Sequence, residues 1–219
     1  MGADERVFAP QMREIPQLTV PRWLPPQSPN ESLASYAARM ARHVDPGRPC
    51  FVGGASFGGF VALEMARHLQ TRACFLIGSV RSPRELPARI TMLRSAGRAI
   101  PHLPWELLCR IAGLGVIALG QCSTPATRSF FEQLSDSDAN FLRWATRAVL
   151  TWQPDERAFD FPIHHIHGAR DHVLPAARTR SDRLVAGAGH VLSLTHADEV
   201  TEFLKQHMRS TAPTEHATL

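Results

Sequence analysis

Lysine and tyrosine are almost absent from this chain of 219 residues, in which Lys205 is the single lysine and Tyr36 the single tyrosine. The positive charge is therefore almost entirely arginine, and the net charge is +4. The arginines are scattered among acidic residues and form no runs. Because nucleic-acid binding needs a basic stripe rather than a high isoelectric point alone, we expect no nucleic-acid partner.

Cysteine is also scarce, and none of the four cysteines belongs to a Cys-x-x-Cys pair. Cys50 and Cys74 stand at the starts of predicted strands, and Cys109 stands in an apolar helical pattern. This spacing indicates buried, reduced thiols rather than a disulfide framework. The residues after Met1 lack the basic and apolar segments of a signal peptide, so we expect a cytoplasmic protein.

Long hydrophobic runs are missing. The longest apolar stretch, Trp105 to Leu119, is interrupted by Glu106 and Arg110 and is too short to cross a bilayer, so we expect no membrane span. With 219 residues, of which 44% are hydrophobic, the chain is long enough to bury one sizeable core.

The most informative segment is the one around Ser56. An apolar, strand-like run ends in Gly54-Ala55-Ser56-Phe57-Gly58, and a helical pattern begins immediately afterwards. This is Gly-x-Ser-x-Gly between a strand and a helix, the context in which the serine is a nucleophile. The flanking glycines let the chain pass through a tight turn without Cβ clashes. The alternative is a glycine-rich turn that binds a ligand without chemistry.

Two downstream loops carry the base and the acid that a nucleophilic serine needs. A short strand pattern and a glycine turn precede Asp171, and a second short strand pattern precedes His190. Because the loops at the strand ends of open α/β sheets gather functional groups, we expect both side chains to reach Ser56. Glu85 and Asp182 remain alternative acids.

His196 remains an alternative base, although it lies where the last helix is predicted to start. A helix capped by Thr195 would place Val200 and Phe203 toward the core. An earlier helix is predicted to begin with Ser28 as its N-cap.

The order Ser56, Asp171, His190 resembles that of α/β-hydrolase fold serine hydrolases of the small esterase and thioesterase kind. The resemblance extends over nearly the whole chain, to about His207. It implies a mostly parallel sheet with helices on both faces. It also implies that Ser56 is the nucleophile, His190 the general base, Asp171 the orienting acid, and the Phe57 N–H an oxyanion donor.

The same resemblance implies a small-molecule acyl ester or thioester as substrate and an acyl-enzyme as intermediate. No nucleotide-binding glycine pattern or metal motif is present in the sequence, so we expect no cofactor. Two alternatives remain open: an acyltransferase with the same triad, and a truncated, inactive hydrolase-fold protein.

The resemblance also implies a buried strand ahead of the site, ending in a loop that supplies a second oxyanion N–H. The segment Met1-Gly2-Ala3-Asp4 looks like the middle of that loop, and the strand expected after it spans Leu18–Trp23. We therefore expect the true start to lie upstream or the chain to be a truncated product, unless the sheet re-pairs. If Met1 is the terminus, its ammonium group is the second oxyanion donor.

The alternation of strands and helices divides the chain. Residues 1–80 and 155–207 are predicted to form the two parts of a hydrolase core. Residues 81–154 are predicted as a helical lid insertion broken by prolines, and residues 208–219 as a disordered tail.

Three apolar residues of the lid insertion, Trp105, Leu108 and Ile111, are candidates for the wall of a substrate pocket. The alternative is that they pack the lid onto the core.

Several histidines precede Asp171 closely, which raises the question of a metal site. Strand alternation places His165 and His167 on one face and His164 on the other, so the three rings do not converge. We therefore predict no metal site, and interpret His167 as part of the turn that directs Asp171.

Overall fold

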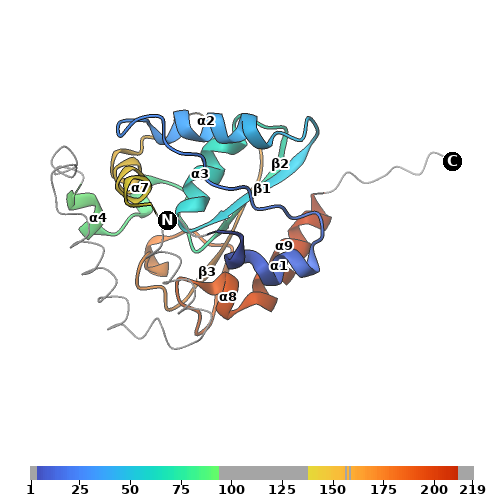
Figure 1. The fold of residues 1–219 in the computed structure, drawn as a ribbon. Helices are drawn as coiled ribbons and strands as arrows, with labels where there is room; N and C mark the ends of the chain where they lie inside the picture. The colour runs from blue at the N-terminus through green and yellow to red at the C-terminus, as the bar shows by residue number, and fades with distance from the viewer. Residues whose placement is uncertain (1–3, 94–137, 156, 158, 212–219) are drawn as a thin grey trace.

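The computed structural model describes residues 4–93, 138–155, 157 and 159–211. Within these residues, a four-stranded parallel sheet has the order β1-β2-β3-β4, and Figure 1 labels the first three of these strands. The strands are β1 (Cys50–Ala55), β2 (Thr71–Ile77), β3 (Ile163–Gly168) and β4 (Arg183–Val185). The parallel sheet predicted from the sequence is confirmed.

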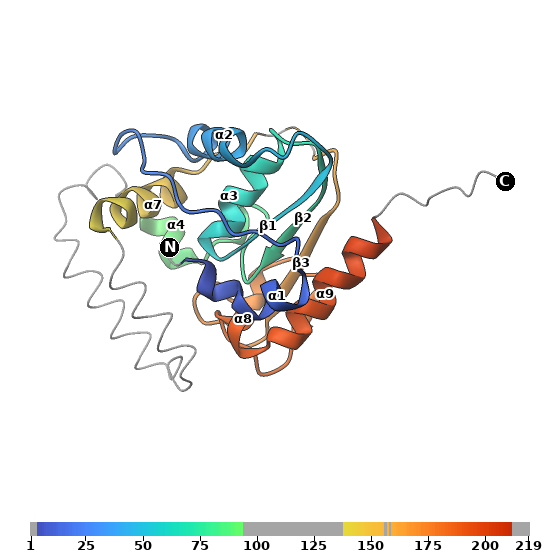
Figure 2. The same ribbon diagram turned by 45° about the vertical axis from the view of Figure 1, so that its right-hand side comes forward.

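Helices cover both faces of this sheet, as predicted (Figures 1 and 2). One face carries α2 (Leu33–Val44), α3 (Phe57–Ala66) and α7 (Ala139–Thr151). The other carries α1 (Ala9–Glu14), α8 (Leu192–Thr195) and α9 (Ala197–Ser210). Shorter described elements are η1 (Glu5–Phe8), η2 (Pro83–Glu85), α4 (Ala88–Leu93) and η4 (Ala176–Arg178).

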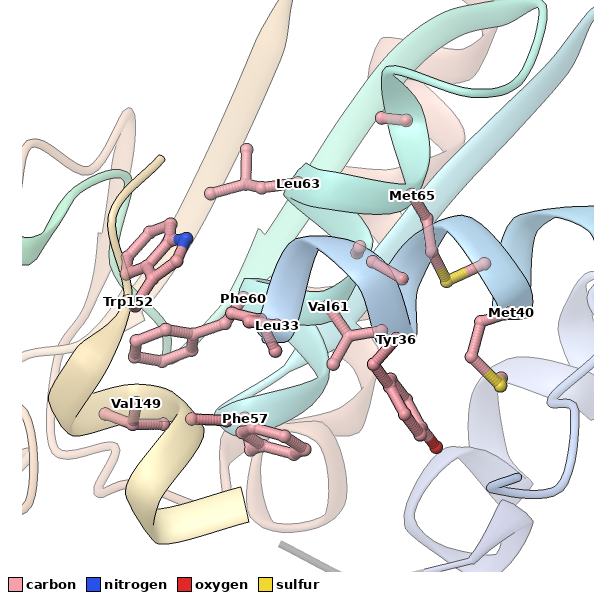
Figure 3. Packing of buried hydrophobic residues seen from close by; sticks show 14 of the residues in the cluster. Leu33, Tyr36, Met40, Phe57, Phe60, Val61, Leu63, Met65, Val149 and Trp152 are labelled. Atoms are coloured by element: carbon pink, nitrogen blue, oxygen red, sulfur yellow. The ribbon is translucent and has the colours of Figure 1, made fainter. Parts of the chain in front are cut away.

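The larger core lies between the sheet and α2, α3 and α7. Tyr36 and Met40 of α2 pack there with Phe57 and Val61 of α3, and Trp152 follows the end of α7 (Figure 3). Every residue of α3 except Gly58 is buried, so hydrophobic burial fixes this helix directly behind the turn at Ser56.

The smaller core lies on the opposite face. There Phe75 of β2 and Ile166 of β3 pack against Val200 and Phe203 of α9. Neighbouring residues of β2 alternate between the two cores, since Cys74 belongs to the first. Burial on both faces explains why β2 has a continuous apolar sequence.

The strand predicted over Leu18–Trp23 is wrong, because this segment is irregular and pairs with no described strand. Pro21 removes one backbone donor, which disfavours a ladder. The two ends of the segment pack in different cores instead: Leu18 packs in the smaller core, and Trp23 contacts Phe57 in the larger core. As a result β1 is an edge strand of the described sheet.

The predicted helix starts are also corrected. Helix α2 begins after Ser32, whose Oγ accepts the Ser35 N–H at 3.1 Å, and not after Ser28. The Glu31 carboxylate accepts the Gln27 N–H at 2.7 Å and pairs with Arg39, so it does not close a capping box onto the Ser28 N–H. Helix α9 begins after His196 rather than Thr195, which ends α8.

The inward-facing positions predicted for the last helix, Val200 and Phe203, are confirmed as buried. Helix α9 continues to Ser210, so the tail expected from residue 208 does not begin there. The reason is that Met208 lies one turn after Leu204 on the same face and still packs against the smaller core.

The lid candidates Trp105, Leu108 and Ile111 lie outside the described residues, as does Met1. The described parts of the interval 81–154 are helical at η2, α4 and α7.

Candidate active site

Ser56 occupies a strained turn between β1 and α3. Its φ of 51° makes it the single non-glycine residue with positive φ among those described. Such a conformation persists only where the surroundings enforce it. The Ser56 N–H donates to Ile77 O at 3.0 Å, and Ser79 Oγ donates to Ser56 O at 2.8 Å. Ser79 therefore helps to hold the turn. It belongs to no sequence motif, so the sequence alone did not point to it.

The glycines around Ser56 differ in how much space a Cβ atom would have at each position. A Cβ on Gly54 would lie 2.2 Å from the carbonyl carbon and oxygen of Gly58, and a Cβ on Gly59 would lie 2.3 Å from Ser79 Oγ. By contrast, a Cβ on Gly58 would meet nothing nearer than Trp23 at 3.9 Å. The expectation that Gly58 is required to avoid a clash is therefore wrong, because the close approach is made by its carbonyl group and not by its Cα hydrogens.

The structure brings Ser56, His190 and Asp171 together. His190 Nε2 lies 2.8 Å from Ser56 Oγ, and His190 Nδ1 lies 2.8 Å from Asp171 Oδ2. Ser56 follows β1, Asp171 follows β3 and His190 follows β4, so all three stand at the carboxyl ends of parallel strands. In this arrangement His190 can accept the hydroxyl proton of Ser56 while donating its own Nδ1 proton to Asp171.

The Asp171 carboxylate is buried but well supplied with donors. Its Oδ1 accepts the N–H groups of Val173 and Leu174 at 2.8 and 2.9 Å. Burial opposes ionisation, yet hydrogen bonds from His167 and His190 outweigh it and hold the pKa of Asp171 well below its usual range. Asp171 is therefore negatively charged at neutral pH and able to stabilise a proton on His190.

The alternative acids and base have other partners. Glu85 accepts the backbone N–H groups of Arg81 and Arg180, and Asp182 pairs with the Arg81 guanidinium at 2.8 Å. His196 Nδ1 lies 3.0 Å from Thr195 Oγ1. None of these contacts involves Ser56, and Asp171 and His190 are the pair that reaches it.

Phe57 is the first residue of α3. The first N–H groups of a helix have no partner within the helix, and the N-terminal end of the helix dipole favours negative charge. The Phe57 N–H, next to Ser56, is thus suitably placed in the chain to stabilise an oxyanion. Met1, the candidate second donor, is outside the described residues.

The histidines of β3 divide between the two sheet faces, as strand alternation predicts. His165 and His167 contact each other at 3.0 Å, whereas the His164 ring packs against His207 on the other face, with centroids 4.2 Å apart. No group of three metal-ligating side chains occurs within the described residues. Over the same part of the chain, every helix is too short or too polar to traverse a bilayer.

His165 is completely buried, and its burial, followed by the proximity of His167, lowers its pKa from 6.5 to about 3. In the unfolded chain this histidine takes up a proton below pH 6.5, whereas in the folded protein it stays neutral until about pH 3. The unfolded state therefore binds more protons in this window, so the free energy of unfolding falls as the pH decreases through it.

We expect the His165→Gln variant, which keeps an N–H near the Nε2 position but does not titrate, to lose stability less steeply on acidification. The difference in slope should approach about 1.4 kcal/mol per pH unit well below pH 6.5. Urea unfolding at a series of pH values measures both slopes. Parallel slopes for the two proteins would contradict the prediction.

A sequence profile described as the alpha/beta hydrolase family matches residues 4–203. No curated protein matches the sequence significantly. A thermophilic esterase from Thermogutta terrifontis is structurally similar, with a TM-score of 0.69, 16% identity, and coverage of 95% of this chain and 86% of the esterase.

Two further solved structures resemble the chain at low identity. An N-acyl homoserine lactonase has a TM-score of 0.64 and 17% identity, with 98% of this chain and 88% of the lactonase covered. The epoxide hydrolase of Bacillus megaterium has a TM-score of 0.69 and 9% identity, with 94% of this chain and 90% of that enzyme covered. The TM-scores show a shared fold, and at identities this low the similarity shows the fold alone.

Proposed function

Because the chain belongs to the alpha/beta hydrolase family, we propose that it is a serine hydrolase that cleaves carboxylic esters or thioesters through an acyl-enzyme on Ser56. The observation that carries the proposal is the continuous hydrogen-bonded chain from Ser56 Oγ through His190 to the ionised Asp171. That order of contacts is what activation of a serine hydroxyl by a general base requires.

In the proposed reaction, Ser56 Oγ attacks the carbonyl carbon of the substrate and His190 Nε2 takes the hydroxyl proton. The negative charge that develops on the carbonyl oxygen faces the Phe57 N–H at the start of α3. Collapse of the intermediate expels an alcohol or thiol, which receives the proton from His190. Water activated by His190 then attacks the acyl-enzyme and releases the acid.

The side chain at the turn favours acyl chemistry over epoxide opening, although both kinds of enzyme share the fold. Attack of a serine on an epoxide carbon would leave an alkyl ether, which water does not readily cleave. Attack of Ser56 on an ester, thioester or lactone carbonyl leaves an ester, which the same base can hydrolyse. An acyl substrate is therefore the class that Ser56 can turn over.

The test is covalent labelling with a fluorophosphonate, followed by intact mass and peptide mapping. We expect one adduct per chain, located on Ser56, and no adduct in Ser56→Ala. A matched control, Ser35→Ala, removes an exposed serine of α2 and should label like the unmodified protein. A folded protein that takes up no label, or labels equally in Ser56→Ala, would show that Ser56 is not an activated nucleophile.

A further inference from the structure

Two histidines share one oxygen of the Asp171 carboxylate. His190 Nδ1 lies 2.8 Å from Asp171 Oδ2, and His167 Nε2 lies 3.3 Å from the same atom. The other oxygen, Oδ1, accepts the backbone N–H groups of Val173 and Leu174. Asp171 thus offers one oxygen to its own turn and the other to two imidazole rings.

The contacts of His167 admit one tautomer. Its Nε2 lies 2.7 Å from Leu174 O, which can only accept, so Nε2 carries the proton. Its Nδ1 lies 3.0 Å from His165 Nε2 and accepts the proton of that nitrogen. Both rings are completely buried, so neither can turn toward water. The Nε2–H of His167 is consequently donated to Leu174 O, and Asp171 Oδ2 lies 3.3 Å from the same nitrogen.

We propose that His167 is a positioning residue that acts on His190 through Asp171, by holding its protonated Nε2 atom 3.3 Å from the same carboxylate oxygen that receives the His190 proton. A second donor stabilises the negative charge on that oxygen and weakens its attraction for the proton of His190. The Nε2 of His190 then remains available to accept the Ser56 proton. The catalytic consequence rests on the proposed function; the effect on His190 does not.

The other charged groups near the buried pair balance one another within the described part of the chain. His165 faces His167 from β3 and interacts with Arg81 and Asp182. Arg81 and Asp182 form an ion pair with each other at 2.8 Å, so their charges largely offset. Asp171, whose Oδ2 contacts both rings, therefore links His167 to His190.

Two substitutions of His167 test the N–H group near Asp171: one variant keeps such a group and the other removes it. His167→Gln places an amide N–H near the position of Nε2 and can still donate to Asp171. His167→Asn places its amide near the position of Nδ1, so it keeps a polar group toward His165 but offers Asp171 no donor. Both changes replace one buried ring by an uncharged amide, and the two amides differ from each other by one methylene.

The measurement is the NMR titration of the His190 ring, identified by its loss in His190→Asn. We expect the titration midpoint to rise by about half a pH unit or more in His167→Asn. We expect His167→Gln to keep the midpoint of the unmodified protein. Equal midpoints in all three proteins, or the same rise in both variants, would overturn the proposal.

This titration needs no substrate, so its result is independent of whether the protein hydrolyses esters; failure of fluorophosphonate labelling contradicts the proposed function instead. A second measurement needs no substitution and applies if His167→Asn does not fold. The long-range proton–nitrogen NMR spectrum of the unmodified protein should show the His167 proton on Nε2. A proton on Nδ1 would equally overturn the proposal.

Discussion

Replacing Ser56 with alanine is expected to lower kcat/KM for ester or thioester hydrolysis by about 10⁴- to 10⁶-fold. The variant loses the atom that attacks the carbonyl group, while His190 and Asp171 remain hydrogen-bonded to each other. The peptide N–H and C=O groups of residue 56, which bind Ile77 and Ser79, are also retained. The fold should therefore survive the loss of turnover.

The rates are measured on a panel of short- and medium-chain acyl esters, thioesters and lactones, with Ser35→Ala as the control. Thermal unfolding of each variant verifies that the fold is intact. An unchanged kcat/KM in folded Ser56→Ala would contradict the nucleophile assignment. Product analysis in the presence of an added alcohol separates hydrolysis from acyl transfer, because only transfer yields a new ester.

Gly54→Ala is expected to destabilise the fold by about 3 kcal/mol or more, because its Cβ would overlap backbone atoms that cannot rotate away. The clash is with the carbonyl group of Gly58 at 2.2 Å, so β1 and α3 would have to separate. The turn that holds Ser56 would open, and fluorophosphonate labelling should be lost with the native stability.

The other glycine of the same motif supplies the control. Gly58→Ala adds a Cβ whose nearest neighbour is Trp23 at 3.9 Å, and it removes a glycine from a helix. It should therefore be neutral or stabilising by up to about 1 kcal/mol. Thermal unfolding compares the two variants, and the distinction fails if both lower the midpoint temperature by the same amount.

The segments that sequence analysis predicted well are those in which neighbouring residues carry the information. The strand, turn and helix around Ser56 follow directly on one another, and the apolar run of β2 is long enough to signal burial on both faces. Strand alternation also correctly placed His164 on the opposite sheet face from His165 and His167, because successive side chains of a strand point to opposite faces.

The incorrect predictions concern segments in which tertiary contacts override a local pattern. Leu18–Trp23 has a strand-like composition, but its side chains are divided between two cores and the segment forms no strand of the described sheet. The helix starts after Ser32 rather than Ser28 because the Ser32 Oγ caps the Ser35 N–H, while Glu31 just before it pairs with Arg39 inside α2. Neither contact leaves a periodic signal in the sequence.

The local pattern of the chain was enough to identify an α/β fold and to name Ser56, Asp171 and His190 as candidates, since each follows a recognisable strand. Only the tertiary structure decided that Asp171, and not Glu85 or Asp182, meets His190. Those contacts join residues 19 and 134 positions apart, and they depend on strand order and loop geometry. The same is true of the clash that a Cβ on Gly54 would make and of the Asp171 oxygen that His167 and His190 both approach. Such contacts are set by how the strands and loops meet in space, which no local periodicity encodes.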